Sequence, residues 1–281
     1  MILYYAVGGG LGHLSRATAV IHTLGLEVQE VLILTSVKSA IEIPFFQEYR
    51  IEVLPAHFQQ AREAYETWLR DCLQKYAIAE IFIDAFPGGL IGEWHFLAEP
   101  SFRELRLVYV ARLLQWEKYL PFVSKELFFR ETLLLEPLEE AHYQYIELQS
   151  FLVRAPQLQY PEAKSVKLPR LPAEAWLIVH SGPPHEVQAL CHLAQETARL
   201  EDLKPSFVLI SLEKNSKISD KVQYLPFYPA HLLFAQAARI FTACGFNAMY
   251  QTRPFAAKHH FLPFERHYDD QFLRAQQRYV L

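Results

Sequence analysis

The sequence predicts an α/β protein made of two Rossmann-like domains that face each other across a cleft. Short apolar runs alternate with longer segments of helical periodicity along most of the chain. A glycine-rich loop directly follows the first apolar run, and a proline-containing stretch without apolar periodicity interrupts the alternation near the middle. With 281 residues, the chain is long enough for two domains of ordinary size.

In the first half, the apolar runs predict strands and the periodic segments predict the helices between them. The first helix, from about His13 to Leu24, has apolar residues at spacings of three and four, which indicates one buried face. Strands are expected at 2–7, 31–34, 51–54, 81–83, 107–110 and 132–135, and a long amphipathic helix at 59–76. The aromatic stretch 113–129 is expected to be a buried or interdomain helix; the alternative, peripheral contact with a membrane surface, is not expected.

Residues 156–172 contain four prolines and predict a linker, so the domains are expected at 1–155 and 173–281. In the second domain, strands are expected at 176–180, 207–210, 222–225, 240–242 and 260–262. Helices are expected to start near Pro184, Ala230 and Phe246, and a last helix is expected at 269–279.

Composition narrows the class of protein. Half of the residues are hydrophobic and 21% are charged, which is typical of a globular core. A net charge of −4 gives no reason to expect a nucleic-acid partner. Three scattered cysteines suit a reducing compartment. Neither a signal peptide nor an apolar run of about 20 residues is apparent, so a cytoplasmic location is expected.

The loop 8–12, with the sequence GGGLG, is the first candidate site. Gly10 and Gly12 allow the backbone to approach a ligand closely, and the start of a helix favours an anion or a polar oxygen. His13 follows at the edge of the sheet, with Arg16 one turn further along the helix. An imidazole in such a place suits the deprotonation of a hydroxyl group. The alternative is a capping or core-edge histidine that only shapes the turn.

Asp84 ends a buried strand and precedes a Pro-Gly turn, at the edge of the sheet where α/β folds bind ligands. Its carboxylate is expected to orient His13 or to bind an acceptor hydroxyl; the alternative is a local cap of the turn. Glu93 is a weaker candidate nearby.

The second half contains candidates for an anion site. Ser181 and Gly182 follow the first strand there, although two prolines beside them remove amide donors. Gly245 precedes a predicted helix whose first amides would face an anion, with Phe246 and Asn247 in its first turn. Asn247 is expected either to bond a phosphate oxygen or to cap the helix.

Three segments resemble a known family. GGGLGHLSRA resembles the N-terminal motif of GT-B glycosyltransferases related to the peptidoglycan N-acetylglucosaminyltransferase, and of predicted glycosyltransferases with a GxGHxxR signature. FIDAFPGGLIGE resembles the D-x-F-P-x-G…E segment of the second group, and 240–276 resembles the GT-B donor signature.

The resemblance implies a metal-independent, inverting transfer from a nucleotide-sugar, UDP-linked as the first guess, to a hydroxyl acceptor, without a cofactor. It makes His13 the catalytic base or an acceptor-binding residue, and it adds Asp270 and Gln271 to the donor site. Gln251 stands where the family has the acid that binds the donor ribose.

Two alternatives remain open at this stage: a nucleotide-sugar hydrolase on the same scaffold, and a non-catalytic nucleotide- or sugar-binding protein. No metal site is expected, because ligand-facing loops lack paired carboxylates. His259 and His260 are adjacent in a predicted strand and would point to opposite faces.

Overall fold

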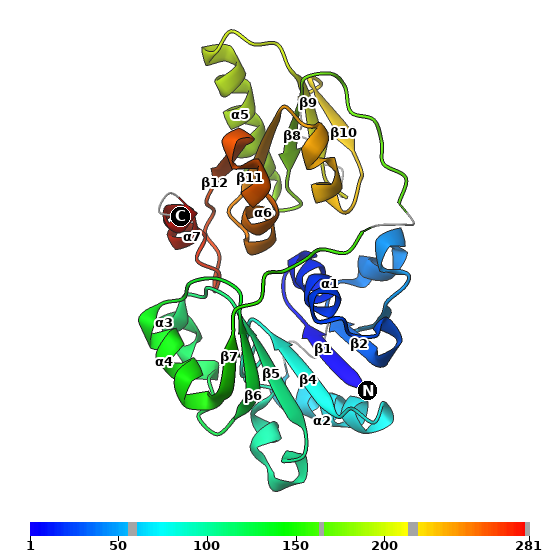
Figure 1. The fold of residues 1–281 in the computed structure, drawn as a ribbon, viewed down its shortest axis with the longest axis vertical. Coiled ribbons are helices and arrows are strands. Elements are labelled where there is room, and N and C mark those ends of the chain that lie inside the picture. Colours follow the sequence, from blue (N-terminus) through cyan, green and yellow to red (C-terminus); the bar gives the residue numbers. More distant parts are fainter. Residues whose placement is uncertain (56–60, 163–165, 213–218, 279–281) are drawn as a thin grey trace. The chain divides into compact units, whose positions relative to one another are not determined.

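The computed structural model describes residues 1–55, 61–162, 166–212 and 219–278. The chain forms two compact units. The first is Met1–Glu162 together with His267–Asp269, and the second is Ala163–Arg266 together with Asp270–Leu281. Each unit has one parallel β-sheet with helices packed against it (Figure 1), so the α/β prediction is confirmed. The chain returns to the first unit for residues 267–269 before its last helix.

The sheet of the first unit has seven parallel strands in the order β3-β2-β1-β4-β5-β6-β7. Their bounds are β1 Ile2–Ala6, β2 Val31–Thr35, β3 Arg50–Val53, β4 Glu80–Asp84, β5 Arg106–Ala111, β6 Phe129–Leu134 and β7 Ser150–Arg154. Because β1 pairs with β2 on one side and with β4 on the other, the direction of winding reverses between β1 and β4. Loops at the carboxyl ends of two such strands diverge and leave the usual ligand site of this architecture.

The α-helices of the first unit are α1 Gly12–Leu24, α2 Arg62–Lys75, α3 Trp116–Tyr119 and α4 Glu140–Gln149. Short 3-10 helices lie at Val28–Glu30, Lys38–Glu42, Pro44–Phe46, His95–Ala98, Pro100–Phe102 and Leu120–Phe122. Gly25 ends α1 in the left-handed conformation with a φ of 63°. The amides of Gly25 and Leu26 then bond back to His22 and Ile21, as in a Schellman cap.

The expected helix over 113–129 is wrong. This stretch contains only α3 and the 3-10 turn Leu120–Phe122, and β6 already begins at Phe129. Pro121 cannot continue a helical hydrogen-bond ladder, and Val123 is extended with φ −77° and ψ 133°. The start of the expected helix at Gln59 lies outside the described residues, which resume at Ala61, and α2 begins at Arg62.

The second unit has five parallel strands in the order β10-β9-β8-β11-β12. They are β8 Ala175–Val179, β9 Ser206–Ile210, β10 Val222–Leu225, β11 Arg239–Ala243 and β12 His259–Leu262. Its helices are α5 Pro184–Leu200, α6 Phe246–Gln251 and α7 Gln271–Arg278, with 3-10 helices at Ala230–Gln236 and Arg253–Lys258. The segment expected as a helix near Ala230 is therefore of the 3-10 type. Tyr279, the expected end of the last helix, lies outside the described residues.

Apolar side chains of β8 pack on both faces of the second sheet. Trp176 and Ile178 belong to the cluster that includes α5, whereas Ala175 and Leu177 pack with Leu233 and Phe234 on the other face. Such double coverage explains why the strands of this sheet form short continuous apolar runs in the sequence. The winding reverses between β8 and β11, so the second unit repeats the ligand-site geometry of the first.

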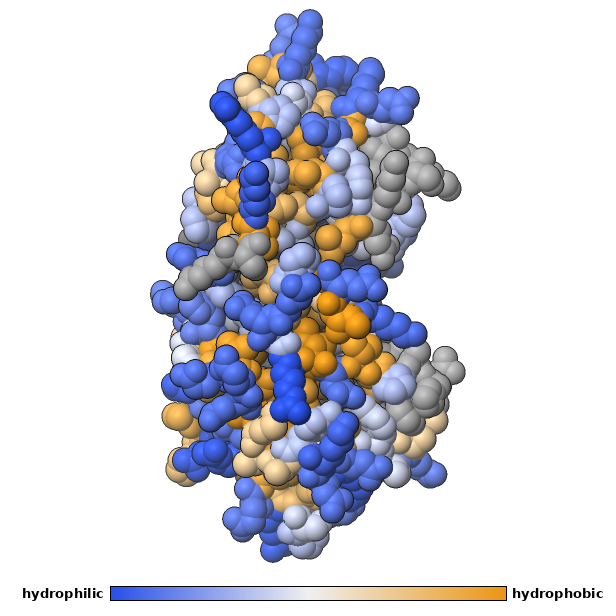
Figure 2. Space-filling view, turned by 90° about the vertical axis from the view of Figure 1, so that its right-hand side faces the viewer, coloured by the Kyte–Doolittle hydropathy of each residue, from blue (hydrophilic) through white to orange (hydrophobic). Residues whose placement is uncertain are grey.

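Hydrophobic residues come to the surface in patches among hydrophilic ones on the face that Figure 2 shows. None of the helices that the structure describes is long and apolar enough to cross a membrane.

Candidate functional site

The loop 8–12 joins β1 to α1 at the point where the first sheet reverses its winding. Ser36, just after β2, fixes this loop: its hydroxyl donates to the carbonyl oxygen of Gly8 at 2.7 Å and accepts from the amide of Gly8 at 3.3 Å. Gly10 has a φ of 80° and requires glycine for its conformation. A Cβ added at Gly8 would lie 2.2 Å from Nε2 of His13. The glycine therefore leaves the space in which the imidazole lies.

Asp84, the last residue of β4, holds together the polar groups of this site. Arg16 binds its carboxylate in a bidentate manner, with Nε at 2.6 Å from Oδ1 and Nη2 at 2.5 Å from Oδ2. His13 Nδ1 lies 2.5 Å from Oδ2, and Tyr4 donates to Oδ1 at 3.5 Å. Burial raises the pKa of Asp84, but Arg16 and His13 outweigh it and lower the pKa to about 2. The carboxylate is therefore ionised at neutral pH.

His13 is oriented by this carboxylate. Because ionised Asp84 can only accept, Nδ1 carries the proton of a neutral ring, and Nε2 is left with its lone pair. Among the described residues, no group bonds Nε2. Burial lowers the pKa of His13 below 6.5, against the opposing effect of Asp84, and Arg16 and Arg112 lower it further. The ring is therefore neutral at pH 7 and can accept a proton at Nε2.

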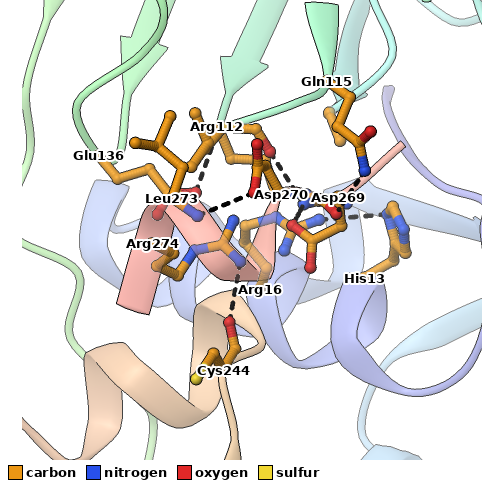
Figure 3. A network of polar contacts seen from close by, with 12 residues as sticks. His13, Arg16, Arg112, Gln115, Glu136, Cys244, Asp269, Asp270, Leu273 and Arg274 are labelled. Atoms are coloured by element: carbon orange, nitrogen blue, oxygen red, sulfur yellow. Dashed lines mark hydrogen bonds and ion pairs between the residues drawn. The ribbon is translucent and has the colours of Figure 1, made fainter. Parts of the chain in front are cut away.

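The two capping interpretations of these residues are wrong. Leu11, not His13, is the N-cap residue of α1, and no side chain caps that helix. Asp84 accepts from His13, Arg16 and Tyr4 rather than from the amides of its own turn. Arg16 was expected to bind substrate, but its side chain is buried and bound to Asp84. Figure 3 shows Arg16 next to His13 on α1. Gly12 is the first residue of α1.

Glu93, the weaker candidate, is fully buried and serves the loop that follows β4. Its carboxylate accepts from the amides of Leu90 and Ile91 at 2.9 and 2.8 Å and from the hydroxyl of Tyr5. Gly89 has no room for a Cβ because the carboxylate of Glu93 lies there. All these contacts are internal, so the structure gives Glu93 a role in holding the loop 89–93 in place.

In the second unit, the loops after β8 and β11 hold the predicted anion-site residues. Ser181 is exposed after β8, and Gly245 precedes α6 after β11. A Cβ at Gly245 would meet nothing within 4 Å, so open space adjoins the backbone there.

The predicted residues of α6 differ in what they leave exposed. Phe246 is buried against Tyr250, which leaves only its backbone to face a ligand, and Asn247 lies half-buried in the first turn of α6. Gln251 ends α6 half-buried, and no described residue bonds its side chain.

Other predicted residues of this unit have structural partners. Asp270 caps α7 by accepting from the amide of Leu273 at 2.9 Å, and the buried Gln271 accepts from the amide of Phe264 at 3.0 Å. Arg274 of α7 donates to the carbonyl oxygen of Cys244 (Figure 3) at 2.9 Å. Helix α7 therefore fixes the start of the Gly245 loop.

Sequence reasoning missed a second histidine–carboxylate pair. His180, just after β8, lies 2.7 Å from Oε2 of Glu186, and Arg266 binds the same carboxylate through two nitrogens. Gly182 lacks a Cβ where His180 Nε2 lies, at 2.3 Å from the position such an atom would take. Its absent side chain thus makes room for this pair. The available signal was a strand-ending histidine with a carboxylate one helical turn into the next helix.

Within the described parts of the chain, no three His, Cys, Asp or Glu side chains gather as metal ligands. His259 Nε2 lies 2.8 Å from the Thr242 hydroxyl, and the His260 ring stacks on Phe241.

Comparison with solved structures gives matches over nearly the whole chain. The spinosyn forosaminyltransferase SpnP has a TM-score of 0.63 at 13% identity, covering 99% of this chain and 83% of its own. The spinosyn rhamnosyltransferase SpnG, in complex with thymidine diphosphate, has a TM-score of 0.57 at 12% identity and covers 98% and 83%. The fold is of the GT-B type.

The same fold occurs outside sugar transfer. A UDP-N-acetylglucosamine 2-epimerase from Rickettsia bellii has a TM-score of 0.57 at 11% identity, over 96% of this chain and 80% of its own. No protein-family model matches the sequence, and a search of curated proteins found none similar enough to report. At these identities the comparisons show the fold, and the chemistry has to be argued from the site.

The buried contacts of Glu93 lead to a stability prediction. Glu93→Ala leaves the Leu90 and Ile91 amides and the Tyr5 hydroxyl without their acceptor, and we expect the free energy of unfolding to fall by about 3 kcal/mol. Urea denaturation measures this. Glu48→Ala, at an exposed position, is the control and should change it by less than about 0.5 kcal/mol. Equal stability of the two variants would contradict the role given to Glu93.

Proposed function

We propose that this protein is a glycosyltransferase that moves a sugar from a nucleotide-sugar to a hydroxyl acceptor, without a metal ion and with inversion. The single observation that carries the proposal is the His13–Asp84 pair. A neutral histidine, oriented by a permanently ionised carboxylate, presents an unbonded Nε2 at the reversal point of the sheet. The likeness to solved glycosyltransferase structures supports this assignment.

In the proposed step, Nε2 of His13 takes the proton of the acceptor hydroxyl. The acceptor oxygen forms a bond with the anomeric carbon of the donor, while the bond from that carbon to the diphosphate oxygen breaks and its electron pair leaves with the nucleotide. Asp84 stabilises the imidazolium that forms. Arg16 keeps the pKa of Asp84 too low for the carboxylate to take the proton itself.

We assign the donor to the second unit. The open space beside Gly245, the loop of Ser181 and the uncommitted amide of Gln251 are the groups that would meet a nucleoside diphosphate, and Asp270 and Gln271 are further donor residues by resemblance. UDP is the first choice for the nucleotide. The solved relatives named as complexed with thymidine diphosphate and as acting on a UDP-sugar support a nucleotide of this kind.

A nucleotide-sugar hydrolase remains the second candidate, because His13 could deprotonate water in place of an acceptor. Identification of the product, free sugar or glycoside, separates the two reactions.

The donor assignment predicts nucleotide binding that depends on Gly245. Isothermal calorimetry should detect UDP binding to the wild type. Gly245→Ala should fold normally, because its φ of −67° suits alanine and the methyl group meets no protein atom. The methyl group would occupy ligand space, so we expect the Kd for UDP to rise by about tenfold.

Gly9→Ala is the matched control, since a Cβ there also meets nothing within 4 Å but lies in the first unit. It should leave the Kd for UDP unchanged. If no nucleoside diphosphate bound at millimolar concentration, the donor assignment would be wrong.

Metal independence predicts that turnover persists in a chelator. The sequence offers no paired carboxylates in a ligand-facing loop, so leaving-group charge would be stabilised by protein groups alone. We expect the rate of sugar transfer in excess EDTA to match the rate without it. A rate lost in EDTA and restored by magnesium or manganese would contradict this mechanism.

The role of His13 predicts a loss of rate in His13→Asn. The asparagine amide replaces Nδ1 as a donor to Asp84 but offers no base at Nε2, so kcat should fall by about 10²–10⁴. The stability should change little. This variant is preferable to alanine because His13 is buried and hydrogen-bonded, and its truncation would also disturb Asp84.

His22→Ala, at an exposed position of the same helix, is the control for kcat. The pH dependence provides a second measurement. Since the pKa of His13 lies below 6.5, wild-type kcat/KM should fall only below pH 6.5, and this acid limb should be absent in His13→Asn. Near-normal turnover in a stable His13→Asn protein would rule out His13 as the base.

A further inference from the structure

The segment His267–Asp269 lies between β12 and α7 of the second unit but packs in the first. Gln115 holds this segment there through two hydrogen bonds. The backbone N–H of Gln115 donates to the carbonyl oxygen of Tyr268 at 2.7 Å, and its side-chain Nε2 donates to the carbonyl oxygen of Asp269 at 3.3 Å. Figure 3 shows Gln115 and Asp269 joined in this way near His13.

An ion pair anchors the same segment. Arg112, directly after β5, binds the carboxylate of Asp269, and the two side chains are only 8% and 15% exposed. Removal of one partner from such a buried pair leaves an uncompensated charge, so the pair resists opening. The carbonyl group of Tyr268 and the next residue, Asp269, are thus held by Gln115 and Arg112.

These contacts place the ring of Tyr268 in an aromatic group beside His13. Tyr268 meets Phe86 edge-on, with centroids 5.5 Å apart at 67°, and Tyr119 at 5.6 Å and 86°. Phe86 also stacks with the His13 imidazole, at 5.8 Å and 28°. Tyr268 and His13 therefore lie against the same phenylalanine.

The aromatic side chains of this group differ in their exposure and in whether their hydroxyl groups are already hydrogen-bonded. Phe86 and Tyr119 are buried, and the Tyr119 hydroxyl is bound to the backbone of Gly88 and Gly89. Tyr268 and Phe122 are half-buried, with their rings 6.4 Å apart at 85°. In the part of the chain that the structure describes, the Tyr268 hydroxyl has no hydrogen-bond partner. The half-buried Tyr268 ring, with an uncommitted hydroxyl, thus lies against Phe86, the same ring that stacks with the His13 imidazole.

We propose that Tyr268 binds the acceptor and positions it against His13, and that the acceptor is a hydroxyl compound whose ring has an apolar face. The ring of Tyr268, with Phe122, contacts that face, and the phenol hydroxyl bonds a polar group of the acceptor. Both a pyranose and an aromatic ring offer this chemistry. The proposal rests on the proposed function, because it takes the base to be His13.

The first experiment measures binding without turnover. The probes are phenyl β-D-glucopyranoside, with both rings, methyl β-D-glucopyranoside, with the sugar ring alone, benzyl alcohol, with the aromatic ring alone, and glycerol, which has none. Saturation-transfer NMR and titration should show binding of phenyl β-D-glucopyranoside to the wild type and none of glycerol. The single-ring probe that also binds identifies the preferred ring.

Two substitutions test the residue. Tyr268→Ala should raise the Kd of phenyl β-D-glucopyranoside by about tenfold, and Tyr268→Phe, which keeps the ring, by about threefold. The Kd for UDP should not change in either. Tyr143→Ala, a tyrosine at an exposed position of α4, is the control and should leave every Kd as in the wild type. Lack of binding by all ring probes, or equal Kd values in wild type, Tyr268→Phe and Tyr268→Ala, would overturn the proposal.

Turnover separates this inference from the proposed function. With a transferable acceptor, Tyr268→Phe should raise KM for the acceptor more than it lowers kcat. If the wild type transfers no sugar but binds ring probes through Tyr268, the transferase assignment fails and the binding role stands. If transfer depends on His13 but Tyr268 variants keep the acceptor KM, the role of Tyr268 alone is wrong.

Discussion

The bidentate ion pair between Arg16 and Asp84 is the interaction on which the candidate site depends. It joins the first turns of α1 to the end of β4, two elements that are far apart in sequence, and it takes place where both side chains are buried. A buried carboxylate without a cation would take up a proton. With Arg16 in place, Asp84 stays ionised and can fix the tautomer of His13. The same pair thus joins α1 to β4 and keeps ionised the carboxylate that orients the proposed base.

Three glycines, which have no side chain, also shape the two sites. Gly8 and Gly182 each lie where a Cβ would collide with a histidine that is paired with a carboxylate, whereas Gly245 adjoins open space. The first two glycines are explained by packing within the protein, and the third is not. Open space at Gly245 therefore leaves room for a ligand, whereas packing within the protein already accounts for Gly8 and Gly182.

The two units repeat one physical solution. In each, a histidine near the carboxyl end of the central strand is bonded to a carboxylate that an arginine also binds. The two units differ in the element that carries the carboxylate. Asp84 lies at the end of the neighbouring strand β4, whereas Glu186 lies in α5, the helix that follows His180. Because parallel sheets collect the ends of several strands at one edge, such clusters can be assembled from different elements. Residues 267–269 extend this principle, since a segment between β12 and α7 packs Tyr268 against Phe86, the ring that stacks with His13.

The sequence by itself determined the fold class, most strands and the position of Asp84 at the end of a buried strand, because apolar periodicity and strand–loop–helix order are local properties. It missed β7, an edge strand whose Phe151 is 91% exposed, and it predicted a helix at 113–129, where Pro121 and tertiary contacts favour short turns. Only the tertiary structure decided that Arg16 binds Asp84, that Glu93 supports a loop, and that Tyr268 lies against Phe86. Arg16 and Asp84 are 68 positions apart in the sequence, Tyr5 and Glu93 are 88 apart, and Phe86 and Tyr268 are 182 apart. No local pattern specifies such pairs, since they form only when the strands have assembled and burial makes each polar group require a partner.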